Sequence, residues 1–192
     1  MNALIHANGL TKTYNDAVVL DLKDLEIPRG ESFGLVGNNG AGKTTFFRLI
    51  LDLIKADSGV VESGGENVAG SNHWKAYTGS YLDKHFLIDF LTPEEYFDFL
   101  GSVYRISEGD VKAFLEDFGE LFNNEVLGKN KYIRDLSSGN QQKVGIASAM
   151  MSKPEVLILD EPFNSLDPTT QIRLKRKLNE LRSDPKVTML IS

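Results

Sequence analysis

The sequence predicts an α/β fold with a mainly parallel sheet. Apolar runs typical of strands alternate along the chain with segments whose apolar residues recur at helical spacing. The run VLIL at 156–159 is continuously apolar, as expected of a strand buried on both faces of a parallel sheet. The 192 residues are enough for one domain with its own core, so we expect a single domain over residues 1–192.

The first third of the chain is predicted to contain strands, one loop and one helix. Apolar alternation predicts strands within ALIHANGL (3–10) and VVLDLKDLEI (18–27). Residues 33–36 are predicted to be a buried strand that enters a glycine-rich loop. The segment KTTFFRLILDLI has apolar residues at helical spacing out to Leu53, and residues 60–62 are predicted to be a short strand.

A helical insert is predicted over residues 90–125, between the α/β parts. Thr92 can cap a helix that begins at Pro93, and Glu95 can reach back to complete a capping box. We expect this helix to run to about residue 104 and a second one, EGDVKAFLEDFGELF, to start after Ser107.

The last third is predicted to alternate helices and strands. KVGIASAMM (143–151) is predicted to be a helix with small residues for close packing, and EVLILDEP (155–162) a buried parallel strand that ends in two acids. Asp167 is expected to begin a helix that runs to about Arg182, and KVTMLIS (186–192) to form the last strand.

Composition excludes several classes of protein. The chain is 41% hydrophobic and 25% charged, which is typical of a soluble globular domain. Its net charge of −6 argues against a general nucleic-acid binder, and the absence of cysteine excludes disulfides and thiolate metal sites. The most apolar stretch, at 46–54, is too short to span a membrane, and the N-terminus lacks the pattern of a secretory signal.

The stretch GNNGAGKT at 37–44 matches the phosphate-binding pattern G-x-x-x-x-G-K-[ST] at every fixed position, between a predicted strand and a predicted helix. Its glycines let backbone amides fold around phosphate oxygens, and the helix N-terminus favours an anion. Lys43 is expected to reach the β- and γ-phosphates, and the Thr44 hydroxyl to bind Mg²⁺. The alternative is a glycine-rich turn with an exposed lysine. The predicted nucleotide-binding residues of this loop are Gly37, Asn38, Asn39, Gly40, Ala41, Gly42, Lys43, Thr44 and Thr45.

Asp160 and Glu161 follow the predicted central strand, at the edge of a parallel sheet where ligands bind. A carboxylate there can hold the Mg²⁺ that Thr44 also binds, and we assign this role to Asp160. Glu161 is expected to face the attacking water and to act as its general base. Taken alone, the pair is also consistent with an acidic turn after a strand.

These motifs, in their order, resemble the nucleotide-binding domain of an ATP-binding cassette (ABC) ATPase. The chain has GNNGAGKTT, a helical insert, LSSGN, LILDEP and NSLD, and the resemblance covers nearly its whole length. The resemblance implies a P-loop NTPase (RecA-like) core with a mainly parallel sheet, an N-terminal antiparallel β-subdomain and an inserted α-helical subdomain. It implies that the α/β core comprises residues 1–80 and 141–192, and the helical subdomain residues 81–140.

The stretch RDLSSGNQQK at 134–143 resembles the signature of the family, which faces the phosphate loop of a second domain so that two ATP molecules lie between two domains. By resemblance, Ser137, Ser138, Gly139 and Asn140 contact the partner's ATP, at a helix N-terminus that attracts phosphate. An ordinary serine cap is the alternative. Ser138 replaces the usual glycine and Asn140 the usual glutamine, and we expect these changes to affect hydrolysis more than binding.

Four further residues take roles by resemblance. Tyr14 resembles the aromatic residue that stacks on adenine, with Val19 lining the same ring; an exposed strand tyrosine is the alternative. Asp167 resembles the segment that contacts the opposing domain, although a helix cap explains it equally well. The connector glutamine of the family is missing, and the aligned position is near Asp83, which can reach a cation or be a solvated loop acid.

The resemblance implies the ATP-hydrolysing subunit of a membrane transporter, with Lys43 and Glu161 as catalytic residues and Mg²⁺ accompanying ATP. The implied partners are a second nucleotide-binding domain, identical or a paralogue, and an integral membrane subunit that docks around residues 81–90; no nucleic acid is implied. This places the protein on the cytoplasmic face of the cell membrane. The sequence does not identify the transported substrate, because residues 30–59 resemble exporter-type members whereas SGNQQKV resembles sugar importers.

Two other functions are considered. A soluble ABC protein acting on ribosomes or DNA is disfavoured by the single cassette, the short helical insert and the negative net charge of the chain. An ATP-binding regulatory module without turnover is suggested because the family's histidine after the last strand is missing: the sequence stops at Ser192, and His6, His73 and His85 lie elsewhere. We expect truncation before that histidine.

Overall fold

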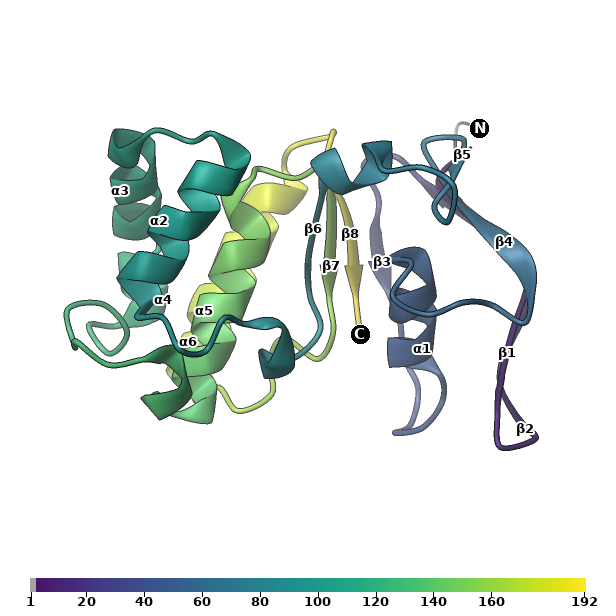
Figure 1. Ribbon diagram of the computed structural model, residues 1–192, viewed down its shortest axis with the longest axis horizontal. Helices are drawn as coiled ribbons and strands as arrows, with labels where there is room; N and C mark the ends of the chain where they lie inside the picture. The colour runs from purple at the N-terminus through teal and green to yellow at the C-terminus, as the bar shows by residue number, and fades with distance from the viewer. Residues whose placement is uncertain (1–2) are drawn as a thin grey trace.

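The computed structural model describes residues 3–192 and contains two sheets and several helices (Figure 1). The elements in chain order are β1 (Ala3–Tyr14), β2 (Ala17–Pro28), β3 (Ser32–Gly34), α1 (Lys43–Ile50), β4 (Ser58–Ser63), β5 (Glu66–Asn67), η1 (His73–Ala76), β6 (Thr78–Tyr81), η2 (Lys84–Phe86), α2 (Pro93–Tyr104), α3 (Glu108–Asp117), α4 (Gly119–Phe122), η3 (Ile133–Asp135), α5 (Ser138–Met151), β7 (Val156–Leu159), α6 (Pro168–Arg182) and β8 (Thr188–Ile191). Over residues 3–192, the helices are all too short or too polar to cross a membrane.

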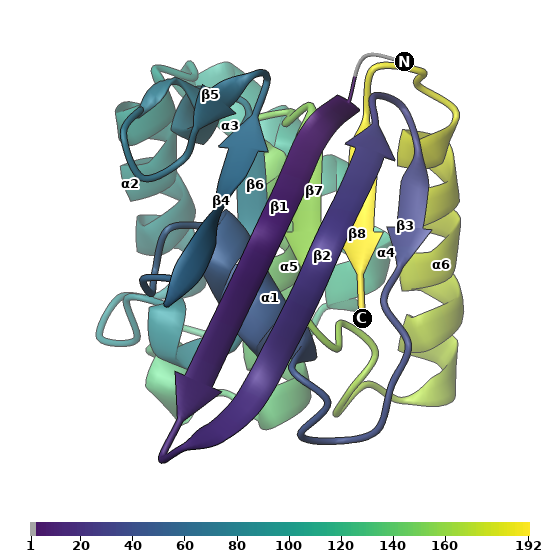
Figure 2. The same ribbon diagram turned by 90° about the vertical axis from the view of Figure 1, so that its right-hand side faces the viewer.

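The N-terminal sheet is antiparallel, with strand order β2-β1-β4-β5. β1 and β2 form a hairpin whose two turn residues, Asn15 and Asp16, have φ angles of 47° and 63°. Two-residue hairpin turns require this left-handed conformation, which asparagine and aspartate adopt readily. Figure 2 shows this sheet crossing in front of the rest of the molecule. The predicted early strands and the antiparallel β-subdomain are confirmed.

The second sheet is entirely parallel, with strand order β3-β8-β7-β6. Its inner strand β7 is buried along its whole length. Val156 and Ile158 pack into the core shared with the antiparallel sheet, whereas Leu157 and Leu159 pack into the core on the other face. This alternation explains why the strand is continuously apolar, because both of its faces are covered.

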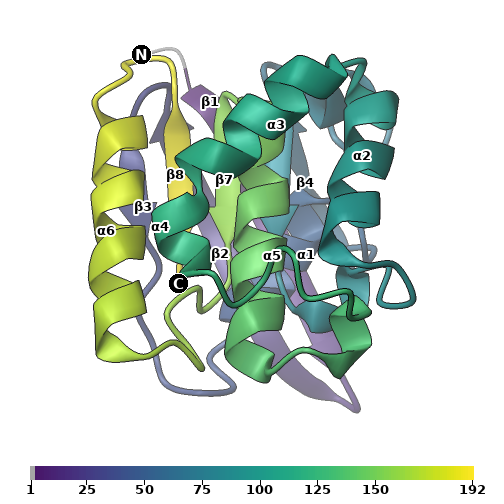
Figure 3. The ribbon, with the colours of Figure 1, turned by 90° about the vertical axis from the view of Figure 1, so that its left-hand side faces the viewer.

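The helices cover the two faces of the parallel sheet unequally. α1 lies between the two sheets, and its apolar side chains share one core with both of them. α5, α6 and the shorter helices α2–α4 cover the opposite face (Figure 3). The first turns of α1 and α5 therefore lie on opposite sides of the parallel sheet, at the same lower edge in Figure 1.

The helical insert forms largely as predicted. α2 begins with the expected capping box: the Thr92 hydroxyl accepts the amide of Glu95 at 3.3 Å, and the Glu95 carboxylate accepts the amide of Thr92 at 2.8 Å. The predicted single helix after Ser107 is instead two pieces, because the chain leaves helical geometry at Phe118 between α3 and α4. The Phe118 ring stacks between Phe114 and Phe122, at centroid distances of 4.5 and 6.1 Å.

Two predictions at the ends of elements were wrong. β3 ends at Gly34, and Val36 is 98% exposed because the chain has already turned into the phosphate loop. α1 ends at Ile50, and Asp52 has a φ of 50°, which stops the helix before Leu53. Leu53 is consequently 48% exposed instead of buried on the helix face.

Candidate functional site

The phosphate loop connects β3 to α1 at the carboxyl edge of the parallel sheet. Gly42 is the N-cap of α1, with a φ of 86°, and an added Cβ there would lie 2.5 Å from the carbonyl oxygen of Val19. Glycine is therefore required both by the backbone angle and by the close approach of β2. The cap supplies no side-chain acceptor and the first turn has no acidic residue. The first amides of α1 are left to bind an anion.

The Lys43 side chain lies along this loop. Its Nζ donates to the carbonyl oxygens of Gly37 at 2.8 Å and Asn38 at 3.2 Å. Residues 37–41 are exposed. The ammonium is thus held over an open loop, where it can transfer its hydrogen bonds to phosphate oxygens.

Thr44 and Asp160 meet where the sequence predicted a shared magnesium site. The Thr44 hydroxyl donates to Oδ2 of Asp160 at 2.5 Å, and the Ser192 hydroxyl donates to Oδ1 at 2.6 Å. These hydroxyl and carboxylate oxygens are the hard ligands that Mg²⁺ prefers. Among residues 3–192, no cluster of three or more His, Cys, Asp or Glu side chains could enclose a metal. The donor set therefore fits a Mg²⁺ that phosphate oxygens and water complete.

Glu161 adopts an unusual backbone conformation, with a φ of 45°. Its amide donates to the Ser192 hydroxyl at 2.9 Å, and its Oε2 accepts Nδ2 of Asn164 at 2.5 Å. These bonds hold the left-handed residue and its carboxylate in place. Glu161 lines a cavity of about 480 Å³ together with Lys43, Asn39 and residues on both sides of the phosphate loop. The predicted base and the predicted phosphate loop therefore share one cavity.

Sequence reasoning missed two residues of this site. Ser192 was taken only as the end of a strand, yet its hydroxyl bridges Asp160 and Glu161. Asn164 was not considered, and it binds the Glu161 carboxylate. The only sequence signal for Ser192 was that it is a polar residue at the end of an apolar strand.

The signature residues lie at the first turn of α5. The Ser137 hydroxyl accepts the amide of Asn140 at 3.2 Å, so the ordinary serine cap is present. Ser137 and Ser138 are exposed. None of the four signature residues lines the cavity that contains Lys43 and Glu161. Within one chain, the signature and the phosphate loop are therefore separate surfaces.

Gly139 packs against the loop that precedes Asp167. An added Cβ at Gly139 would lie 2.6 Å from the carbonyl oxygen of Ser165. Gly139→Ala is therefore expected to lower the free energy of unfolding by about 1–3 kcal/mol, because the backbone must move apart. Urea unfolding of this variant measures the effect, with Gly119→Ala as control because its Cβ would meet no neighbour within 4 Å. Equal stability of the two variants would contradict this contact.

Tyr14 and Val19 lie near the hairpin end of β1 and β2. The Tyr14 ring is 42% exposed, with the Lys12 ammonium 5.5 Å from its centroid. The Val19 carbonyl approaches Gly42 of the phosphate loop. The structure thus brings Val19 to the loop and leaves Tyr14 partly exposed, as the alternative of an exposed strand tyrosine also requires; the contact of both residues with adenine stays a prediction.

Asp83 and Asp167 both serve as helix caps. The Asp83 carboxylate accepts the amide of His85 at 2.7 Å and lies 3.9 Å from the Arg48 guanidinium. Asp167 Oδ1 accepts the amides of Thr169 and Thr170, both at 3.0 Å. A hydrogen bond from the Thr170 hydroxyl is the largest cause that holds the pKa of Asp167 below its usual value. The cap alternative is therefore real for Asp167, whereas the cap at Asp83 was not among the expected roles, which were a cation ligand or a solvated loop acid. The cation role of Asp83 and the dimer contact of Asp167 stay predictions.

Comparison with known proteins identifies the family. The profile described as ABC transporter matches residues 20–164. The chain is 36% identical over 94% of its length to the uncharacterized ABC transporter ATP-binding protein YhaQ of Bacillus subtilis (strain 168), of which it covers 59%. It is 34% identical over its whole length to the bacitracin transport ATP-binding protein BcrA of Enterococcus faecalis, of which it covers 61%. The chain thus spans about three fifths of the length of these two relatives.

Solved structures agree with this assignment. A structure described as the ATP binding subunit of an ABC transporter matches with a TM-score of 0.80 and 26% identity, over 98% of this chain and 79% of that one. CbiO1 from Clostridium perfringens, described as part of the ABC transporter complex cbiONQ, matches with a TM-score of 0.75 and 25% identity, over 100% of this chain and 78% of that one. The chain therefore belongs to the ABC transporter family, among its ATP-binding proteins.

Proposed function

We propose that this chain binds ATP with Mg²⁺ and hydrolyses it as the ATP-binding subunit of an ABC transporter. One observation carries the proposal: Lys43 and Glu161 line one cavity, and the Thr44–Asp160 pair lies at the same sheet edge. These residues are the phosphate ligand, the candidate base and the oxygen donors that ATP hydrolysis requires.

Each residue of the cavity has a defined task in this proposal. Lys43 exchanges the two loop carbonyls for phosphate oxygens and stabilises their charge. Thr44 and Asp160 would hold Mg²⁺, which when bound supplies charge neutralisation between the phosphates. Glu161 accepts a proton from the attacking water, and Asn164 holds its carboxylate in place.

The second proposal is that each site is completed by another nucleotide-binding domain, either an identical chain or a paralogue. The first turns of α5 and α1 lie on opposite sides of the parallel sheet, and no signature residue lines the cavity of Lys43 and Glu161, which supports a site that another molecule completes. The exposed first turn of α5 favours an anion. Two copies arranged head to tail would place the Ser137–Asn140 turn of each over the ATP of the other.

Coupling to transport is proposed from the relatives, whose names describe transport ATP-binding proteins and not ribosome or DNA factors. Phe86 and Phe90 are exposed, whereas Leu87 between them is buried in the core. The exposed rings offer an apolar docking surface to an integral membrane subunit, on the cytoplasmic face of the membrane. The division into a core at 1–80 and 141–192 and a helical subdomain at 81–140 is also proposed, supported by the grouping of α2–α4 on the side of α5 that faces away from the parallel sheet (Figure 1).

Phosphate release from ATP tests the proposed activity and its metal. The protein is expected to lose activity when EDTA removes Mg²⁺ and to regain it when Mg²⁺ is added back. Asp160→Asn is expected to raise the Mg²⁺ concentration for half-maximal activity at least about tenfold, because one charged ligand is lost. Asp89→Asn, on an exposed loop, is the control. Phosphate release that is indifferent to EDTA would contradict the proposal.

A further inference from the structure

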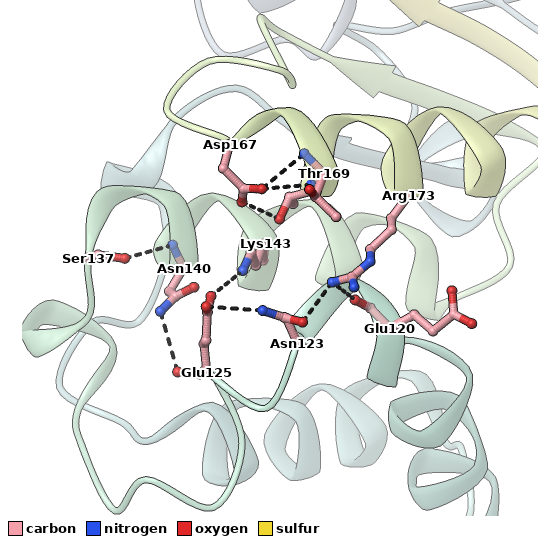
Figure 4. A network of polar contacts seen from close by, with 10 residues as sticks. Glu120, Asn123, Glu125, Ser137, Asn140, Lys143, Asp167, Thr169 and Arg173 are labelled. Carbon is pink, nitrogen blue, oxygen red and sulfur yellow. Dashed lines mark hydrogen bonds and ion pairs between the residues drawn. The ribbon is translucent and has the colours of Figure 1, made fainter.

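A buried lysine, Lys143, follows the signature turn on α5 (Figure 4) and does not line the nucleotide cavity. The Lys143 side chain is only 3% exposed, and its Nζ donates to Oε2 of Glu125 at 2.7 Å. Burying an ammonium is unfavourable unless a partner compensates its charge. Lys143 is on α5, whereas Glu125 lies in the segment that follows α4. The pair therefore joins two parts of the chain that are apart in sequence.

Glu125 extends this contact in two directions (Figure 4). Its backbone carbonyl accepts Nδ2 of Asn140 at 3.3 Å, in the signature turn. Its other carboxylate oxygen accepts Nδ2 of Asn123 at 3.1 Å, and Oδ1 of Asn123 accepts the Arg173 guanidinium of α6 at 2.8 Å. One continuous series of polar contacts thus runs from α6 to the signature turn.

The charge of Lys143 lowers the pKa of two nearby carboxyl groups. The hydrogen bond from Lys143 is the largest cause that lowers the pKa of Glu125. The charge of Lys143 also contributes to the low pKa of Asp167, after the hydrogen bonds from Thr170 and Thr169. The ammonium is bonded to Glu125, and the loop before Asp167 is tied to the same region by geometry: Arg173 of α6 donates to Asn123, and Gly139 packs against the carbonyl oxygen of Ser165.

We propose that Lys143 is a positioning residue for the shared nucleotide site: its buried ammonium fixes the segment 123–125 to α5 and thereby holds the Ser137–Asn140 turn and Asp167 in register with each other. The Ser137–Asn140 turn and Asp167 would both contact the second domain. Their position relative to each other therefore decides whether the closed dimer forms. This inference rests on the proposed sharing of the site between two domains.

The first test compares two lysines in a Glu161→Gln background, in which ATP-bound dimers are expected to accumulate. Lys143→Met removes the ammonium and keeps an unbranched side chain. Lys177→Met is the matched control, because Lys177 also pairs with an acid, Asp117, from a part-buried position but does not touch the signature turn. We expect Lys143→Met to weaken ATP-dependent dimerisation at least about tenfold in analytical ultracentrifugation. ATP affinity of the monomer is expected to stay unchanged, and Lys143→Arg is expected to restore much of the loss.

The second test needs no dimer. In the ATP-free monomer, the amides of Asn140 and Gln141 donate to the hydroxyl and the carbonyl of Ser137. Their hydrogen exchange is expected to be at least about tenfold faster in Lys143→Met, but unchanged in Lys177→Met. If Lys143→Met does not fold, Glu125→Gln removes the same charge pair and is expected to speed the same two amides.

The outcomes separate this inference from the proposed function. If Glu161→Gln alone stays monomeric with ATP, the sharing of the site between two identical chains is wrong, and the exchange rates still decide whether Lys143 holds the turn. Unchanged exchange in folded Lys143→Met, or an equal loss of dimer in Lys177→Met, would overturn the positioning role.

Discussion

Replacing Lys43 with alanine is expected to weaken ATP binding by at least about 100-fold, or about 2.7 kcal/mol. The Nζ donates two hydrogen bonds within the phosphate loop, at 2.8 and 3.2 Å, and is held where phosphates would lie. Hydrogen bonds between charged groups contribute about 1.5–3 kcal/mol each, so losing two of them accounts for the expected effect. Calorimetric titration with ATP and Mg²⁺ measures the change.

A matched control distinguishes the loss of the phosphate-binding ammonium from the loss of a positive charge elsewhere on the protein. Lys186 is exposed on the loop before β8 and lines none of the cavity. Lys186→Ala is expected to bind ATP as the unmodified protein does. Unchanged affinity in a folded Lys43→Ala protein would show that the phosphate loop has been assigned wrongly.

Glu161→Gln is expected to lower turnover about 100- to 1000-fold while ATP binding is kept, because a proton acceptor contributes about this much to catalysis. Glutamine has the shape of glutamate, and its amide oxygen can still accept the hydrogen bond from Asn164. The substitution is not expected to change the left-handed backbone at residue 161, because both side chains branch in the same way beyond Cβ. Steady-state phosphate release measures the loss, and ATP titration shows whether binding persists.

The same variant should accumulate as an ATP-bound dimer, because the step that reopens the dimer is blocked. Size-exclusion chromatography with light scattering, with and without ATP, detects this. Glu155→Gln is the control, since Glu155 pairs with Arg29 at the opposite end of β7. Full turnover in Glu161→Gln would show that another group activates the water.

Local signals in the sequence predicted the helix starts well. Thr92, Ser137 and Asp167 each cap the helix expected of them, because a cap depends on a few neighbouring residues. The ends of α2, α5 and α6 also lie where they were expected, whereas the end of α1 and the break between α3 and α4 do not. The break at Phe118 was missed, although Gly119 directly follows it, at the position where glycine often ends a helix.

The chemistry of the site was predictable from motifs, but its geometry was not. The pattern at 37–44 and the acids after β7 identify the main residues. The bridge from Ser192 depends on the parallel pairing of β8 with β7, which brings the Ser192 amide to the Leu159 carbonyl at 3.2 Å. Contacts between residues 30 apart in sequence follow from sheet register, and no local pattern encodes them.

A mixing experiment tests the shared site most directly. Lys43→Ala damages the phosphate loop, and Ser138→Glu puts a negative charge on the exposed signature turn, where an acid in the first turn of α5 does not disturb the helix. Each variant alone is expected to be nearly inactive, since every site in its dimers is damaged. In a mixed dimer, one site combines the intact phosphate loop of one chain with the intact signature of the other.

An equal mixture should therefore recover about a quarter of the normal phosphate release, because about half of the dimers are mixed and each has one intact site of two. A mixture that stays as inactive as its two components, although ATP-dependent association of the chains is observed, would contradict the sharing of each site between two domains.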